Sequence, residues 1–256
     1  MGCPDEPAES ARADARNATM IVLAFDTSGT ACSVAVADVG HDQSGITPGI
    51  AQSREVVRGH AEALMPMVAD VMAEAGLRFD ALDLIAVTVG PGLFTGLRAG
   101  IAAARGLALA TGVPCVGVSS FAALAATCRR DGPSADVETL AVCIDSRRAD
   151  IFVQAFDRAG KAIDAAAAVL PSALAQRLPA GPVAVAGSAA DPAQHALIAA
   201  GRTARLLPVR SVCPRALIRF AAAAWQNDSA LPPQPLYLRE PDTGPSADAV
   251  PSCRPL

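Results

Sequence analysis

The sequence predicts an α/β fold in which one βββαβαβα unit is used twice. The first observation is that short apolar runs typical of strands alternate with longer helical patterns, and that their order repeats in the second half of the chain. The second is that the first strand of each half ends in an aspartate, Asp26 and Asp145. The third is a stretch at 132–135 that contains Gly, Pro and Ser and is typical of a linker between the halves.

In the first half, a buried apolar run is followed by the turn Asp26-Thr27-Ser28-Gly29 and by a loosely alternating run, a pattern that predicts a hairpin. From His60 onward, apolar residues recur at the spacing of one helix face, and Gly76 ends that helix. The predicted elements are, in order, strands at 20–26, 31–38 and 50–57, a helix at 60–75, a strand at 84–89, a helix at 95–110, a strand at 115–118 and a helix to about 130.

The second half repeats this order. Its predicted elements are strands at 139–145, 149–157 and 161–170, a helix at 171–178, a strand at 182–186, a helix at 192–200, a short strand at 205–207, a helix at 214–226 and an extended segment at 235–239. We therefore predict a disordered N-terminal extension at 1–19, lobes at 20–130 and 137–240, and a disordered tail at 241–256. Met20 stands at the start of the first predicted strand, which makes it a candidate for the native start.

Composition limits the kinds of function to consider. Of the 256 residues, 52% are hydrophobic and 18% are charged, so we expect a sizeable core. The formal net charge of −4 argues against a broad nucleic-acid surface, and an aromatic content of 4% argues against a base-stacking platform. No apolar run reaches the roughly 18 residues that suggest a membrane span. Seven scattered cysteines without a Cys-x-x-Cys pair, and no apolar region near the N-terminus, fit a cytosolic protein with reduced thiols.

A glycine-rich stretch at 88–100 is the most unusual part of the sequence. Gly90, Pro91 and Gly92 predict a tight turn between a strand and a helix, and Thr95 is placed to cap that helix. Free N–H groups at such a helix start suit a phosphate or a carboxylate. The alternative is a plain strand-to-helix connection without a ligand, because the glycine spacing is neither that of a Walker A loop nor that of a Rossmann fold. Both interpretations stay open.

A duplicated βββαβαβα unit is the architecture of actin-like (ASKHA) proteins, whose two lobes enclose a nucleotide cleft. The first hairpins of the lobes face each other there, and their turns supply aspartates near the metal-bound phosphates. Each aspartate can therefore hold a metal–nucleotide complex, or equally cap its own turn. The candidate nucleotide- or phosphate-binding residues are Asp26, Thr27, Ser28, Gly90, Gly92 and Asp145. ATP or ADP with Mg²⁺ is the cofactor that such a cleft would take, and the residues assign none with certainty.

Several short motifs resemble one family. In order, they are Ala24-Phe-Asp-Thr-Ser28, Ala31-Cys-Ser-Val-Ala-Val36, His60 with Leu64-Met-Pro-Met-Val68, Gly90-Pro-Gly-Leu-Phe-Thr-Gly-Leu-Arg98 with Ala104-Arg-Gly-Leu-Ala108, Gly117-Val-Ser-Ser120, Ile144-Asp-Ser-Arg147 and Pro235-Leu-Tyr-Leu-Arg239. Together they resemble the TsaB (YeaZ) family over about residues 20–240. The Gly-Pro-Gly-x-Phe-Thr-Gly-x-Arg block is the most specific. The family usually has a small polar residue at the position of Leu93, which weakens the phosphate-binding interpretation.

The resemblance implies a role in tRNA modification. TsaB is similar to TsaD, the catalytic subunit that transfers a threonylcarbamoyl group onto the adenosine beside the tRNA anticodon. TsaB pairs with TsaD, the ATPase TsaE joins them, and TsaB alone can form a homodimer through its N-terminal half. This chain would then be a scaffold or activator that meets tRNA only through the complex. The implied interface residues are His60, Leu64, Met65, Val68, Met72, Thr95, Arg98, Ala99, Ala102, Ala103 and Gly106.

The residues give little support for catalysis by the chain alone. TsaD-like enzymes hold a metal through a His-x-x-x-His pair, but the residue four positions after His60 is Leu64, and one imidazole is a poor metal site. Ser28 and Ser33 lack a His/Asp relay. We therefore assign no catalytic and no metal-binding residue. An independent ATPase or small-molecule kinase of the same fold is the alternative function. Arg98 is either a surface ion-pair partner, which we favour, or an anion contact.

Overall fold

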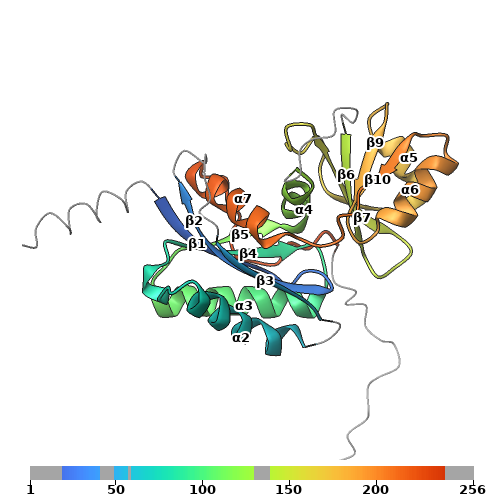
Figure 1. Cartoon of the computed structure of the whole chain (residues 1–256). Coiled ribbons are helices and arrows are strands. Elements are labelled where there is room, and N and C mark those ends of the chain that lie inside the picture. The colour runs from blue at the N-terminus through green and yellow to red at the C-terminus, as the bar shows by residue number, and fades with distance from the viewer. Residues whose placement is uncertain (1–18, 41–48, 57–58, 130–138, 240–256) are drawn as a thin grey trace, which may run out of the picture.

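The computed structural model describes residues 19–40, 49–56, 59–129 and 139–239 (Figure 1). The predicted N-terminal extension, apart from its last residue, lies outside the described residues, as do the linker at 132–135, the tail at 241–256 and residues 41–48, between the second and third predicted strands. Within the described ranges, no helix combines the length and the apolar character that crossing a membrane requires.

Two mixed, five-stranded sheets form the frame of the molecule. In the first, β1 (Thr19–Asp26), β2 (Ala31–Gly40), β3 (Ile50–Glu55), β4 (Leu84–Gly90) and β5 (Cys115–Ser119) lie in the order β3-β2-β1-β4-β5. In the second, β6 (Thr139–Asp145), β7 (Ile151–Asp157), β8 (Ala167–Val169), β9 (Val183–Ala186) and β10 (Ala204–Leu206) lie in the order β10-β9-β6-β7-β8. Each sheet starts with antiparallel hairpins and continues with parallel strands. Read from opposite ends, the two orders are the same, which confirms the duplicated actin-like fold.

Helices cover the faces of both sheets. The helices α2 (His60–Glu74) and α3 (Phe94–Thr111) pack on one face of the first sheet, and α4 (Ser120–Arg129) and α7 (Pro214–Gln226) pack on the other (Figure 1). The helices α5 (Leu174–Arg177) and α6 (Ala190–Ala199) pack on one face of the second sheet. Two short 3₁₀ turns occupy Phe79–Ala81 and Pro171–Ala173.

Each face of the first sheet has its own core, because successive residues of a strand point to opposite faces. Val22 and Ala24 of β1 pack in the cluster that contains α4 and α7. Leu23 and Phe25 pack in the cluster that contains α2 and α3. All four side chains are fully buried. The unbroken apolar run of β1 therefore reflects burial on both faces of the sheet.

The last helix, α7, packs on the first sheet although it follows the second sheet in the sequence. Its side chains Leu217 and Ile218 are fully buried in the same cluster as the inner residues of β1. The backbone N–H of Cys213 donates to Oγ1 of Thr127 (2.9 Å), so that α7 starts beside the end of α4. Residues of β6 and β7 join this cluster as well. Together, α4 and α7 therefore connect the two sheets.

Two element boundaries differ from the predicted ones. The helix α3 begins at Phe94 after an N-cap at Leu93 that makes no side-chain hydrogen bond, so Thr95 lies inside the helix instead of capping it. The strand predicted at 161–170 shortens to β8. Here Asp164 interrupts regular pairing with β7, because its Oδ1 accepts the backbone N–H of Ala155 (2.8 Å) in place of a strand carbonyl.

Candidate functional site

The turn after β1 is held by hydrogen bonds to the side chain of Asp26. This carboxyl group is 1% exposed, and its Oδ1 accepts the N–H of Ser28 (2.9 Å) and the hydroxyl of Thr88 (2.5 Å). Burial raises the pKa of Asp26, and the hydrogen bonds and the nearby His60 oppose that shift. The carboxyl group therefore caps its own turn, which is one of the two roles predicted for it.

The substitution Asp26→Asn is expected to preserve the turn and to raise the free energy of unfolding at neutral pH. Asn Oδ1 accepts the same two hydrogen bonds without a buried charge. The folded-state pKa of Asp26 lies above its unfolded value of about 3.9, so ionisation destabilises the wild type as pH rises through the folded pKa. The advantage of Asn should therefore grow upward from about pH 4. Thermal unfolding of both proteins across this range measures it.

A matched variant, Asp26→Ala, changes the same residue but removes the hydrogen-bond acceptor. It leaves the N–H of Ser28 and the hydroxyl of Thr88 without their partner, which should cost about 1–3 kcal/mol for each group. If the Asn variant proved as unstable as the Ala variant, the capping role of Asp26 would be wrong.

Three glycines let α3 pack closely against this turn. A Cβ atom at Gly92 would overlap the carbonyl oxygen of Ser28, one at Gly96 would overlap that of Thr27, and one at Gly100 would overlap the Thr27 hydroxyl. Thr27 is fully buried, and its Oγ1 donates to the carbonyl oxygen of Gly96 (2.8 Å). The glycine spacing thus serves contact between a helix and the hairpin turn.

Contacts inside the protein already use part of the glycine-rich stretch for which a phosphate-binding role is predicted. The N–H of Leu93, at the start of α3, donates to the carbonyl oxygen of Ser28 (2.7 Å). Gly90 has a left-handed φ of 109°, and a side chain there would crowd the carbonyl oxygen of Leu236. Gly90 and Gly92 therefore shape the turn, and their binding of a phosphate stays a prediction.

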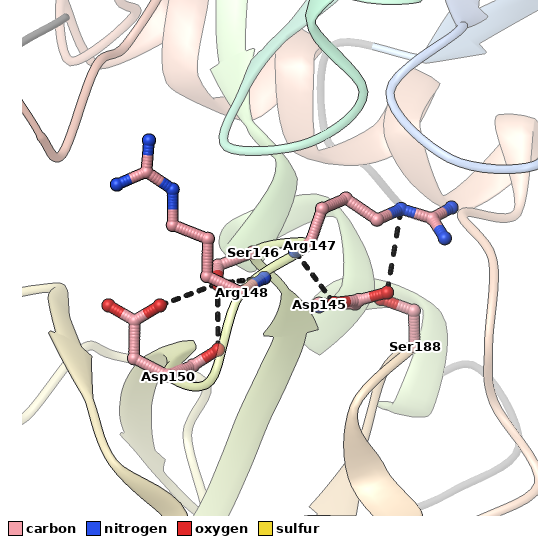
Figure 2. Close-up of polar contacts among 6 residues, drawn as sticks. All are labelled: Asp145, Ser146, Arg147, Arg148, Asp150 and Ser188. Atoms are coloured by element: carbon pink, nitrogen blue, oxygen red, sulfur yellow. Dashed lines mark hydrogen bonds and ion pairs between the residues drawn. The ribbon is translucent and has the colours of Figure 1, made fainter. Parts of the chain in front are cut away.

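The turn after β6 is built in a similar way from its own polar side chains (Figure 2). Oδ1 of Asp145 accepts the N–H of Arg147 (2.8 Å), and Oδ2 of Asp145 lies 3.5 Å from Nε of Arg147. The N–H of Asp145 donates to Oγ of Ser188 (2.9 Å). The hydroxyl of Ser146 donates to Oδ1 of Asp150 (2.6 Å). The carboxylate of Asp145 thus has its charge balanced within its own turn.

A cleft with a volume of about 330 Å³ lies between the two turns. Of the candidate nucleotide- or phosphate-binding residues, Asp26, Ser28 and Asp145 line this cleft, whereas Thr27 is buried behind the turn, and Gly90 and Gly92 are not among the described residues that line it. Sequence reasoning missed several polar lining residues that come from segments far apart in the chain, namely Thr30, Ser120, Arg147, Ser188, Arg210 and Ser211. The only feature of the sequence that could have indicated any of these lining residues is that Ser120 and Arg147 end two of the motifs that carry the family resemblance.

The side chains that the structure describes do not by themselves form a metal-binding cluster at this cleft. The described residues contain no group of three or more His, Cys, Asp or Glu side chains that could hold a metal ion. The ring of His60 is 7% exposed, and its Nε2–H donates to the carbonyl oxygen of Gly29 (3.0 Å). Besides the two aspartates, the polar side chains that line the cleft carry hydroxyl and guanidinium groups, and guanidinium groups suit an oxyanion.

Buried cysteines offer no alternative chemistry. Burial raises the pKa of the Cys32 thiol to about 11 and that of the Cys143 thiol to about 12. Both thiols therefore stay protonated at neutral pH, and the protonated form is a poor nucleophile.

The predicted interface on α2 and α3 needs a correction, because part of it lies in the protein's own core. The buried members are His60, Leu64, Val68 and Met72. They form the inward face of α2, since the helical period that marks a core also points those residues away from solvent. The exposed members are Met65, Thr95, Arg98, Ala102 and Gly106, and the half-buried ones are Ala99 and Ala103. Figure 1 shows α2 and α3 side by side as the outer layer of the first sheet.

Arg98 makes a contact that the sequence did not predict. Its Cζ lies 3.8 Å from the centroid of the Phe94 ring, and its Nε and Nη2 donate to Oη of Tyr237 (3.3 and 3.2 Å). Among the described residues these contacts take the place of the carboxylate or anion that we expected. Phe94 and Tyr237 are about half exposed. The glycine-rich block and the Pro-Leu-Tyr-Leu-Arg segment thus meet at the surface where α3 begins.

Comparison with known proteins gives a consistent assignment. The family model described as TsaD, tRNA N6-adenosine threonylcarbamoyltransferase, matches residues 32–207. An uncharacterized protein of Mycobacterium tuberculosis is 36% identical over 218 residues, which cover 79% of this chain and 90% of that protein. The Escherichia coli tRNA threonylcarbamoyladenosine biosynthesis protein TsaB is 32% identical over 140 residues, which cover 54% of this chain and 56% of that protein. The solved structure of YeaZ from Pseudomonas aeruginosa matches with a TM-score of 0.68 at 28% identity, covering 86% of this chain and 100% of that chain.

Proposed function

Because this chain belongs to the TsaD/YeaZ (TsaB) family, we propose that it is a non-catalytic scaffold and activator subunit for threonylcarbamoylation of tRNA. Its partner is a TsaD-like transferase that modifies the adenosine next to the anticodon. A TsaE-like ATPase joins the pair, and tRNA is contacted only through the complex, in the cytosol. Without its partner, the protein forms a homodimer through the same surface.

The observation that carries this proposal is the outer face of α3. Ala102, Gly106 and Leu109 are exposed, and their spacing of four and three residues places them on one side of the helix. A Cβ atom at Gly106 would meet nothing within 4 Å, so the fold of this chain does not require glycine there. Glycine in an exposed helix costs about 1 kcal/mol relative to alanine. Close approach of a partner helix explains why that position has no side chain.

The neighbouring surface of α2 supports the same placement. Met65 is 40% exposed and lies on the helix beside α3. Its flexible, polarizable side chain can adapt to either of two partners, another copy of this chain or a TsaD-like subunit. We therefore define the proposed interface by Met65, Ala102, Gly106 and Leu109.

The test is reconstituted threonylcarbamoyl transfer to tRNA with the organism's own TsaD and TsaE, threonylcarbamoyl-adenylate and ATP. Product is expected when this protein is included, with none from this protein alone. The variant Ala102→Glu is expected to reduce association with TsaD and product formation by about tenfold or more, because it places an unpaired carboxylate in an apolar contact. Ala102 is preferable to Ala103, which is half-buried against the core. Size-exclusion chromatography measures the association.

Ala199→Glu is the matched control, since Ala199 is an exposed helical alanine on α6, away from the proposed interface. It should associate and support transfer like the wild type. An Ala102→Glu protein that pairs normally would show that the interface lies elsewhere. Transfer that is unchanged when the whole protein is omitted would show that the scaffold role is wrong.

An independent ATPase or small-molecule kinase is the second candidate function. The observation in its favour is the position of the cleft, which lies between the two hairpin turns where actin-like folds bind nucleotides. Turnover of ATP by the purified chain, with no partner present, would favour this candidate over the scaffold.

A further inference from the structure

A groove with a volume of about 360 Å³ lies between α4 and α7. These two helices cover the face of the first sheet that is opposite to α2 and α3 (Figure 1). The groove is lined by three arginines, Arg129 of α4 and Arg215 and Arg219 of α7, together with apolar residues that include Phe220 and Ala223. It is therefore separate both from the cleft between the hairpin turns and from the proposed interface.

The charges of this groove are all positive and are not balanced by the fold. All three arginines are exposed, and neither α4 nor α7 contains an acidic residue. Within the part of the chain that the structure describes, Arg129 and Arg219 make no hydrogen bond or ion pair. Arg215 donates from Nη2 to the carbonyl oxygen of Gly49 (2.7 Å). A guanidinium group has five N–H donors, so all three arginines retain donors for a bound group.

The arrangement of the two arginines on α7 is unfavourable for the helix itself. Arg215 and Arg219 are four residues apart, which places two like charges beside each other on one side of the helix. Arg215 also lies in the first turn, where the helix dipole disfavours a positive charge. A bound anion would offset both effects, and this is why the groove indicates an anionic occupant.

The apolar part of the groove narrows the chemistry of that occupant. Phe220 and Ala223 are half-buried, so an apolar side chain placed against them would lose contact with water on both sides. Three guanidinium groups match a few carboxylates, since each can pair with one carboxylate through two N–H donors. A long polyanion such as RNA is disfavoured, because the whole chain has a net charge of −4.

We propose that the groove between α4 and α7 is a docking site for an acidic segment of a partner protein. Carboxylates of that segment pair with Arg129, Arg215 and Arg219, and an apolar side chain between them packs against Phe220. Because the groove and the proposed interface lie on opposite faces of the first sheet, the acidic partner and a TsaD-like subunit can bind at the same time.

The test measures binding of labelled probes to the full chain by fluorescence anisotropy. The first probe is a peptide that repeats Glu-Glu-Leu, the second has Ser in place of each Leu, and the third is a single-stranded RNA of the same net charge. We expect the first peptide to bind, and to bind more weakly as salt is added. The Ser peptide should bind about tenfold more weakly, since it has no apolar side chain for the groove. The RNA should also bind about tenfold more weakly than the first peptide.

A double variant and a matched control locate the binding. The combination of Arg129→Gln and Arg219→Gln is expected to weaken binding of the first peptide by about tenfold, because it removes two of the three positive charges. The combination of Arg105→Gln and Arg205→Gln removes the same total charge from exposed positions on α3 and β10 and should bind like the wild type. Thermal unfolding of both double variants checks that neither has lost its fold.

Several results would overturn the proposal. These are no binding of the first peptide, unchanged affinity in the groove variant, or equal affinity for the Ser peptide. RNA that binds as tightly as the first peptide, with the same dependence on the groove arginines, would make the groove a nucleic-acid site instead. Self-association that is lost in the groove variant would assign it to a second copy of this chain. The measurement uses this chain alone, so its outcome does not depend on whether the chain pairs with a transferase.

Discussion

Gly96→Ala is expected to lower the free energy of unfolding by about 2 kcal/mol or more. The added methyl group would overlap the carbonyl oxygen of Thr27, and neither the helix nor the turn can move freely, because Thr27 Oγ1 also donates to the Gly96 carbonyl oxygen. Overpacking typically costs about 1–3 kcal/mol and occasionally more, and a Cβ atom that would overlap a backbone oxygen falls at the upper end of that range. Alanine recovers only about 1 kcal/mol through its better helix propensity, so the steric cost dominates. Urea unfolding followed by circular dichroism measures the difference.

Gly106→Ala is the matched control, because it makes the same change ten residues later in the same helix. A Cβ atom there would meet no neighbouring atom, so the propensity gain of up to about 1 kcal/mol is unopposed. The two variants should therefore shift the unfolding midpoint in opposite directions. Low protein concentration keeps self-association from contributing to the Gly106 result. Equal stability of the two variants would show that contact with the hairpin turn does not explain the glycine at 96.

The sequence was sufficient to predict the duplicated fold because its main signals are local. Apolar runs and helical periods identify strands and helices one at a time, and Asp26 and Asp145 mark the ends of equivalent strands. The same local signals explain why these two residues were selected for the cleft, which they do line.

What the sequence could not reveal depends on contacts between distant segments. Residue type predicts Thr95 as the cap, whereas the helix begins where the backbone N–H of Leu93 donates to the carbonyl oxygen of Ser28. The partner of Arg98 is Tyr237, which comes from the last described segment of the chain. Ser120 and Arg210 meet at the cleft from different elements, so no spacing rule relates them.

The helical period identifies the apolar face of a helix, but it does not show what that face packs against. It assigned Leu64, Val68 and Met72 correctly to one face of α2, but that face points to the core, and the proposed partner surface therefore uses the other face. In the same way, it found α7 without showing that this helix packs on the first sheet. Which sheet a helix covers is therefore a property of the three-dimensional arrangement, and it affects how the chain divides into lobes.

A fragment that ends at Arg129 is consequently expected not to fold cooperatively, although it contains all five strands of the first sheet. Its missing part includes α7, whose Leu217 and Ile218 are fully buried. Each such side chain contributes about 1.5–3 kcal/mol on burial, and whole domains are stable by only about 5–15 kcal/mol. Without α7, the part of the apolar sheet face that α4 does not cover is also left open to solvent. We expect binding of a hydrophobic dye and a broad thermal transition for the fragment 19–129.

Joining residues 212–239 to this fragment through a short Gly/Ser linker should restore a cooperative transition. The linker can be short because Cys213 and Thr127 are hydrogen-bonded in the whole protein, so the ends to be joined lie close together. The added segment also brings back the backbone bonds from Leu231 to Gly117 and from Leu236 to Val89. A bare fragment that unfolds as sharply as the joined one would show that 20–130 is an autonomous lobe. Rescue by the joined segment would show instead that the first lobe is completed by the end of the chain, so that the glycine-rich stretch, the cleft and the outer face of α3 all depend on a helix encoded far from them.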